Sequence, residues 1–172
     1  LDGDGDTAEA LPLDPLGTAR ATDGIPEAGA YEAGAAGMSL AYWRTLHFSA
    51  PDRADPAKEA TVWGNDADPE GDGIPNCGEY LLLLDPNACD SPLAGIAVTG
   101  YLGIDWLGFT YTRAKDRPGV TEAIQTSTDL AAWSGTGFLT LLVGETATTT
   151  TYQVLLPLNP PRGFIRFVFT VP

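Results

Sequence analysis

The residues with the clearest chemical potential are four carboxylates between positions 68 and 79. Asp68, Glu70 and Asp72 alternate along a turn that contains Gly73, and Glu79 follows at the end of the stretch. This spacing fits the calcium-loop pattern of alternating Asp or Asn residues, a glycine and a closing glutamate, except that Glu70 stands at the third position. Calcium takes six to eight oxygen ligands, so alternating carboxylates can converge on one ion.

The same pattern assigns a role to each ligand of the loop. We expect Asp68, Glu70 and Asp72 to supply side-chain oxygens, and Ile74 to supply its backbone carbonyl. Glu79 is expected to reach back from a following helix as a bidentate ligand, while the central glycine permits the sharp turn. The alternative interpretation is a solvated acidic turn that binds no metal.

An internal repeat supports the calcium interpretation. Residues 23–31 align with residues 72–80, with identical residues at six of nine positions. The copy has Ala30 where the closing glutamate is needed, so Asp23 is expected to belong to a degenerate site.

Further acidic residues lie at the start of the chain. In the register of the loop, the first carboxylates of that site would precede Leu1. Because the chain opens on Leu1 rather than Met and shows no signal peptide, we expect a processed product, a fragment, or a sequence assigned without its start. Its remaining candidate metal ligands are Asp2, Asp4, Asp6 and Glu9.

The charge of the chain is concentrated in its first half. Residues 1–90 hold 18 of the 23 acidic side chains, and the formal net charge of the whole chain is −14 with a pI near 4.1. An acidic chain without a basic patch argues against nucleic acid and against an anionic membrane surface as partners. The longest apolar run, residues 80–84, is far too short to span a membrane, so no membrane insertion is expected.

Three regions follow one another along the chain. Residues 1–37 form an N-terminal arm with degenerate calcium-loop repeats, and residues 38–90 combine a helix with the calcium loop and a second helix. Residues 91–172 are predicted to form an antiparallel β-domain. The sequence thus predicts a mainly β protein with short helices, in which calcium-loop repeats precede an antiparallel β-sandwich or small barrel.

The element boundaries come from hydrophobic periodicity and breakers. Spacings of two to four predict a helix near residues 38–48, and a second helix is predicted over 76–84. Pro51 and Pro56 are expected to end the first helix in a turn-rich connection. Alternating patterns predict strands at 102–112, 120–127, 138–143, 148–156 and 163–171.

The order D-x-x-G-D-G-I-P-N-x-x-E-Y, with Asp-Pro following at residues 85–86, resembles the calcium-binding thrombospondin type-3-like repeats of secreted bacterial proteins. Residues 42–48 and parts of the C-terminal region are also similar to such proteins. The resemblance implies an exported, calcium-stiffened, non-catalytic module with a C-terminal β-domain. Glu70, the degenerate copy at Asp23, and the two cysteines depart from the pattern.

Cys77 and Cys89 are expected to form a disulfide. Cys77 begins the second predicted helix, and Cys89 follows the Asp-Pro stop, so a returning chain could bring them together in an oxidising compartment. Two free thiols are the alternative.

Evidence for catalysis is thin, and we expect no enzymatic activity. His47 lies in an apolar helical pattern and is interpreted as a packing or capping residue. Asp105 and Glu122 are expected at the surface of strands, without pairing as a glycosidase dyad. Trp106 and Trp133 fit either core packing or an aromatic platform for a glycan.

The function predicted from these features is that of a secreted or cell-surface calcium-binding structural protein, a subunit of an extracellular filament. Its partner would be a second copy of the chain in a head-to-tail polymer, with the arm of one copy packed on the next. The alternative is a non-catalytic carbohydrate-binding or anchoring module of a secreted hydrolase, and an enzyme is a third class.

Overall fold

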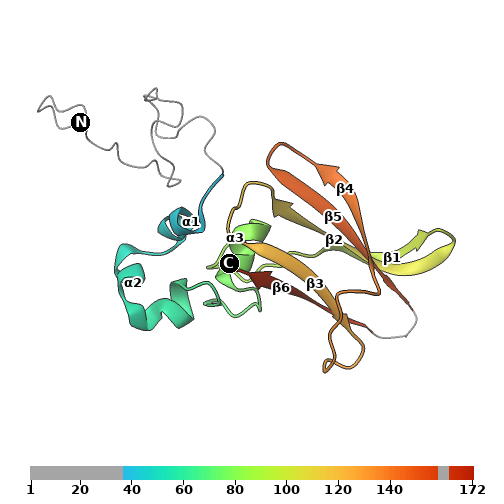
Figure 1. Cartoon of the computed structure of the whole chain (residues 1–172), viewed down its shortest axis with the longest axis horizontal. Coiled ribbons are helices and arrows are strands. Elements are labelled where there is room, and N and C mark those ends of the chain that lie inside the picture. Colours follow the sequence, from blue (N-terminus) through green and yellow to red (C-terminus); the bar gives the residue numbers. More distant parts are fainter. Residues whose placement is uncertain (1–36, 159–162) are drawn as a thin grey trace, which may run out of the picture.

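The computed structural model describes residues 37–158 and 163–172 (Figure 1). The arm, and with it the candidate ligands Asp2, Asp4, Asp6, Glu9 and Asp23, lies outside the described residues. The first described helix, α1 (Leu40–His47), begins where the Ser39 side chain accepts a hydrogen bond from the Tyr42 N–H at 3.2 Å. This cap satisfies a free donor of the first turn, and the helix predicted here is confirmed.

The connection expected to be a run of turns is instead helical. It contains α2 (Ala50–Ala54), the 3₁₀ turn η1 (Pro56–Lys58) and the π-helical turn η2 (Glu59–Trp63). The prolines stand in the first turns of α2 and η1, where the missing N–H has no helical acceptor to lose. None of the helices in the described part of the chain is long and apolar enough to cross a membrane.

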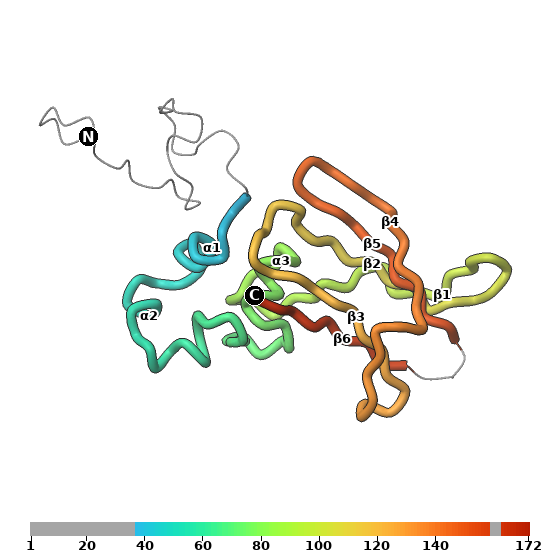
Figure 2. The backbone as a smooth tube through the Cα atoms, in the orientation of Figure 1, coloured from blue at the N-terminus to red at the C-terminus, as the bar shows by residue number. Residues whose placement is uncertain are grey.

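In the described part of the chain, six strands form two antiparallel sheets (Figures 1 and 2). The larger sheet has the order β1 (Ala94–Tyr101), β2 (Ile104–Ala114), β5 (Thr149–Pro157), β4 (Leu139–Glu145). The smaller sheet pairs β3 (Thr121–Ser127) with β6 (Phe164–Thr170). The mainly β prediction is confirmed. The barrel alternative is wrong, because β1 and β4 remain edge strands within the described residues.

Two hydrophobic clusters meet at α3 (Asn76–Leu82), every residue of which is buried. The first cluster joins α1 to α3 and contains Trp43, Phe48, Cys77, Tyr80, Leu81 and Val120. The second lies between the sheets and contains Leu82, Phe109, Tyr111, Ile124, Val154 and Leu156. Phe169 of β6 packs against both, so the helix after the acidic loop shares its core with the β-domain.

Tyr80 fixes this helix between distant segments. Its hydroxyl lies within hydrogen-bond distance of the carbonyl oxygens of Met38 and Pro118, the latter at 3.1 Å. The Arg117 guanidinium lies 5.0 Å from the centre of the Tyr80 ring. The start of α1 and the β2–β3 connection are therefore both attached to α3.

Candidate metal centre

The mouth of the acidic loop is closed by hydrogen bonds between its two ends. The Asn76 N–H donates to the Ala67 carbonyl at 2.9 Å, and the Cys77 N–H donates to the Asn65 carbonyl at 3.0 Å. The fully buried Asn76 side chain also donates to the Gly64 carbonyl at 2.8 Å. The loop is thus anchored on the first turn of α3, and its ends are fixed.

Asp68 organises the interior of the loop. Its carboxylate accepts hydrogen bonds from the N–H groups of Gly71 at 2.8 Å, Asp72 at 3.2 Å and Gly73 at 2.9 Å. Gly71 and Gly73 have φ of 77° and 92°, a region that side chains with a Cβ rarely adopt. The turn that the sequence predicts at Gly73 is present, and Gly71 makes a second one.

The carboxylates form two overlapping groups that share Asp72. Asp68, Glu70 and Asp72 each offer an oxygen within 4.8 Å of the others, as three of the predicted ligands should. Glu79 forms a group of the same span with Asp72 and Asp90, and its carboxyl also contacts that of Glu70. The loop pattern does not predict Asp90, which stands outside it, and the only signal for Asp90 in the sequence is an acidic side chain after the Asp-Pro stop.

Glu79 is a buried carboxyl group that faces another carboxyl group, that of Glu70. It is 0% exposed, and within the described residues no backbone N–H or positive side chain donates to its oxygens, while the Glu70 carboxyl lies against it. Burial, followed by the neighbouring Glu70 carboxyl, raises the pKa of Glu79 to about 9. Both oxygens of Glu70 are likewise buried, and burial is the main cause that raises the pKa of Glu70.

No positive side chain compensates this charge. Of the ion pairs formed within residues 37–158 and 163–172, none includes a carboxylate of either group. An unpaired buried carboxylate is unstable in a protein interior unless it is protonated or bound to a cation. The donor set is oxygen throughout, which suits calcium or magnesium better than zinc or copper.

The backbone of Ile74 lies against the Asp72 carboxylate. The Ile74 N–H donates to a side-chain oxygen of Asp72 at 2.8 Å. This bond holds one oxygen of Asp72 in position. The predicted role of the Ile74 carbonyl as a metal ligand stays a prediction.

The cysteines are free thiols in the structure, so the expected disulfide is not formed. Cys77 is buried in the cluster around Trp43 and Tyr80, and burial raises the pKa of its thiol to about 11. Cys89 is exposed, and its thiol donates to the Glu70 carbonyl at 3.2 Å. The returning chain therefore brings Cys89 to the loop rather than to the start of α3.

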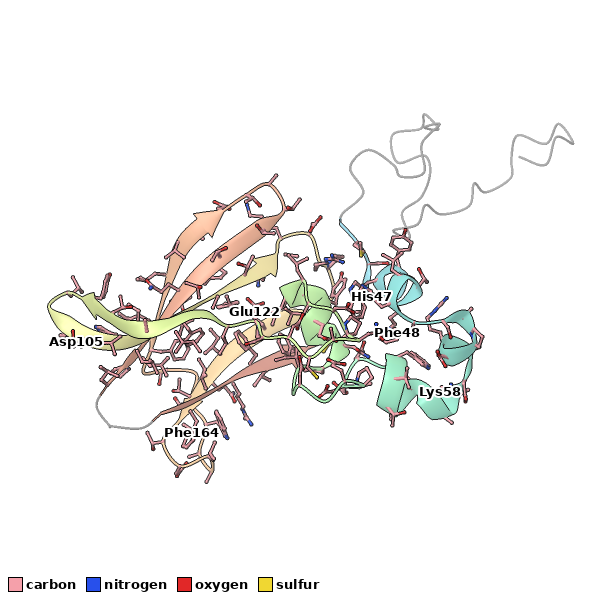
Figure 3. All side chains as sticks on the ribbon, turned by 180° about the vertical axis from the view of Figure 1, so that it is seen from behind. His47, Phe48, Lys58, Asp105, Glu122 and Phe164 are labelled. Atoms are coloured by element: carbon pink, nitrogen blue, oxygen red, sulfur yellow. The ribbon has the colours of Figure 1, made fainter. Side chains whose placement is uncertain are left out.

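The remaining candidate residues are held by internal contacts. His47 packs its ring 4.5 Å from that of Trp43, in agreement with a packing role. Burial lowers the pKa of His47. The acidic pair is far apart in Figure 3, where Asp105 lies on the β1–β2 hairpin and Glu122 lies near α3. Glu122 accepts a hydrogen bond from Arg113 at 2.6 Å.

The two tryptophans considered as a glycan platform also have partners within the chain. The Trp106 indole N–H donates to the Tyr101 carbonyl at 3.2 Å. The Arg166 guanidinium lies 4.2 Å from the centre of the Trp133 ring. These contacts explain the half-buried position of each ring without a ligand.

The similarity to thrombospondin type-3-like repeats has no support beyond its motif residues. No protein-family model, curated protein or solved structure matches the chain at a significant level. The chemistry of the centre therefore rests on its own geometry, on the burial of its carboxylates and on the oxygen donors that it gathers.

Proposed function

We propose that this chain is a secreted calcium-binding structural protein whose acidic loop holds a calcium ion between Asp68, Glu70 and Asp72. One observation carries the proposal, namely that the Glu70 and Glu79 carboxyl groups are buried against each other and form no ion pair within the described residues. A hard divalent cation supplies the missing positive charge.

The spacing of the carboxylates fits the size of calcium. Calcium–oxygen distances are about 2.3–2.6 Å, so two ligands on opposite sides of one ion lie about 5 Å apart. The oxygens of Asp68, Glu70 and Asp72 lie within 4.8 Å of one another, inside this limit. Magnesium demands near-ideal octahedral geometry, whereas calcium tolerates the longer reach of Glu70 at the third position.

The ion would have a structural role. The ends of the loop are tied to α3, and α3 lies in both hydrophobic clusters. A cation that neutralises the loop would therefore stabilise the junction between the helices and the β-domain. This arrangement supports calcium as a stiffening element of the folded module.

The assembly of copies into an extracellular filament is the further part of this proposal. It depends on the arm, residues 1–37, nearly all of which lies outside the described residues. The acidic residues and the degenerate repeat of the arm support it, because they would offer calcium ligands to a second copy. Electron microscopy of the protein in calcium is the direct test, and dispersed monomers at every concentration would overturn the filament.

Calcium binding itself is tested by thermal unfolding in calcium and in chelator. A ligand present at 100 times its Kd stabilises the native state by about 2.7 kcal/mol. For a chain of this size, that stabilisation raises the Tm by roughly 5–10 °C. An equal Tm in both conditions would contradict the proposal.

Two variants test whether the calcium-dependent rise in Tm comes from the acidic loop. Glu70→Gln removes one charge from a carboxyl group whose oxygens are buried, so it should reduce the calcium-dependent rise in Tm. Asp66→Asn is the matched control, because Asp66 is exposed and belongs to neither carboxylate group. It should retain the full effect of calcium.

A further inference from the structure

Both edges of the larger sheet are apolar and electrically neutral. Its outermost strands are β1 and β4, and within the described residues neither pairs with a further strand on its outer side (Figure 1). An edge strand presents unpaired N–H and C=O groups, which proteins usually protect with charged side chains or prolines. Strand β1 contains neither, and β4 contains one charge, that of Glu145. Lys115 forms an ion pair with Glu145 at 2.6 Å, so that charge is compensated.

Each edge also exposes an apolar side chain on the inner face of the sheet. Val98 of β1 is 62% exposed, and Leu142 of β4 is 59% exposed. Val98 pairs with Leu107 and Leu142 pairs with Tyr152, and both of these partners pack against the second hydrophobic cluster. Within the described residues this cluster draws no side chain from β1 or β4. The face that forms the core in the middle of the sheet is therefore uncovered at its two edges.

Each edge has one irregularity, which leaves part of the strand free to pair. The register shifts between Ala94 and Ala97 in β1, and between Leu142 and Gly144 in β4. Bulges are one means by which proteins blunt an edge. Here each lies towards one end of its strand, so the stretches 97–101 and 139–142 keep a regular register.

We propose that copies of this chain assemble by pairing β4 of one copy with β1 of the next in a continuous antiparallel sheet. The inference rests on the filament part of the proposed function and names the surfaces that would form it. The strand directions fit this contact. All three pairings in the larger sheet are antiparallel, so its four strands alternate and β1 runs opposite to β4. A copy displaced sideways in the same orientation therefore places its β4 antiparallel to β1 of its neighbour.

This contact propagates. It joins two different surfaces, so every added copy leaves one β1 edge and one β4 edge free at the ends of the assembly. A contact between unlike surfaces that does not close produces a filament, and the twist of the sheet would make that filament helical. Val98 and Leu142 lie on the same face, so pairing brings the uncovered apolar side chains of two copies together. Removal of their apolar surface from water favours the contact.

The distribution of charge favours a second copy as the occupant of each edge. The chain has a net charge of −14, yet residues 91–172 hold five acidic and five basic side chains. Copies that meet through their β-domains keep the acidic half of each chain outside the contact. A neutral edge offers no electrostatic attraction to a charged partner. A second copy supplies a neutral edge of matching length, since β1 has eight residues and β4 has seven.

Two variants of the full chain test each edge by electron microscopy and sedimentation velocity in calcium. Val98→Lys and Leu142→Lys each place a charge that pairing would bury without a partner. Wild type should form filaments, and each variant alone should remain monomeric. Leu130→Lys is the matched control, because it adds the same charge at a 57% exposed leucine in the β3–β4 connection. It should still form filaments. Far-UV circular dichroism establishes that every variant is folded.

An equimolar mixture of the two variants tests which edges meet. The unchanged β4 of Val98→Lys can pair with the unchanged β1 of Leu142→Lys, but neither product can be extended. The mixture should therefore sediment as dimers without filaments. Dimers of either variant alone would show that like edges pair, and would overturn the contact between β1 and β4. Non-specific aggregation would not stop at two copies, so large aggregates in the mixture would also overturn it.

The outcomes separate this inference from the proposed function. If wild type and both lysine variants all form filaments, edge pairing is overturned while the filament stands. If wild type stays monomeric at every concentration, edge pairing and the filament both fail, and the calcium-dependent rise in Tm still decides calcium binding. If calcium does not raise the Tm, the calcium site is contradicted, whereas filaments lost in both variants and dimers in their mixture still support edge pairing.

Discussion

A Cβ atom built on Gly78 of α3 would lie only 2.5 Å from the ring of Phe169 on β6. The helix that follows the acidic loop therefore touches the smaller sheet through a position that has no room for a side chain. Phe169 also stacks on Phe167, with ring centres 6.0 Å apart, and contacts both hydrophobic clusters. The loop and the β-domain are consequently parts of one packed structure.

Gly78→Ala should destabilise the protein. Alanine favours a helix over glycine by about 1 kcal/mol, but overpacking against the Phe169 ring costs about 1–3 kcal/mol. Urea denaturation should show a net loss of stability of up to about 2 kcal/mol. Gly100→Ala is the control, because a Cβ at Gly100 in β1 meets no atom within 4 Å. Equal free energies of unfolding for the two variants would show that the Phe169 ring moves aside without an energetic cost.

Tyr80→Phe should destabilise the junction between α1 and α3. The change removes a hydroxyl that lies against the Met38 and Pro118 carbonyls and leaves them without this donor. The expected loss is about 1–3 kcal/mol in urea denaturation. In the described part of the chain, the Tyr152 hydroxyl has no protein partner, so Tyr152→Phe should change stability by less than about 0.5 kcal/mol. If Tyr80→Phe left the free energy of unfolding unchanged, water would be replacing the hydroxyl.

The stability of the calcium-free protein should fall as the pH rises. Burial and Glu70 raise the pKa of Glu79 from the usual 4.5 to about 9 in the native state. Between these values the native state binds a proton that the unfolded state has lost, so raising the pH favours unfolding. Glu79→Gln should remove this part of the pH dependence. Urea denaturation in chelator from pH 5 to pH 9 measures the difference between wild type and variant.

Saturating calcium should oppose this fall, because the bound ion favours the ionised carboxylate in the native state. Parallel pH profiles of wild type and Glu79→Gln in chelator would contradict the assignment of the slope to Glu79.

The two cysteines should react at very different rates with a thiol reagent. Cys89 is exposed, whereas Cys77 is buried and its pKa is raised to about 11, so little thiolate forms at neutral pH. Mass spectrometry after brief alkylation should show one modified site in the native protein and two after unfolding. Cys89→Ser should remove the fast site. A chain that remains unmodified even when unfolded without reductant would instead contain the disulfide.

Local patterns predicted much of the fold. Strands β2 to β6 were expected within two residues of their observed ends, because alternation of side chains is a property of neighbouring residues. Strand β1 was missed, since Ala94–Tyr101 contains two glycines and several small residues that give no clear alternation. The short helices that contain Pro51 and Pro56 were missed, because Ser49 and Asp55 cap them and the prolines were interpreted as helix breakers.

The candidate site was predicted in part for the same reason. Asp68, Glu70 and Asp72 lie on one tight turn, so their spacing alone brings their oxygens together. Asp90 reaches the site only because the chain turns back after α3, and no local pattern encodes that return. The same turn places Cys89 against Glu70, away from Cys77, and this made the expected disulfide wrong.

The sequence by itself determined the acidic turn, the alternation of the strands and the concentration of negative charge in the first half, since all three depend on residue types and short spacings. Only the tertiary structure decided that Glu79 is buried against Glu70, that Asp90 joins it, and that β2 pairs with β5 in the larger sheet. These features depend on which distant segments pack against α3. That packing comes from the sum of many apolar contacts spread over the whole chain.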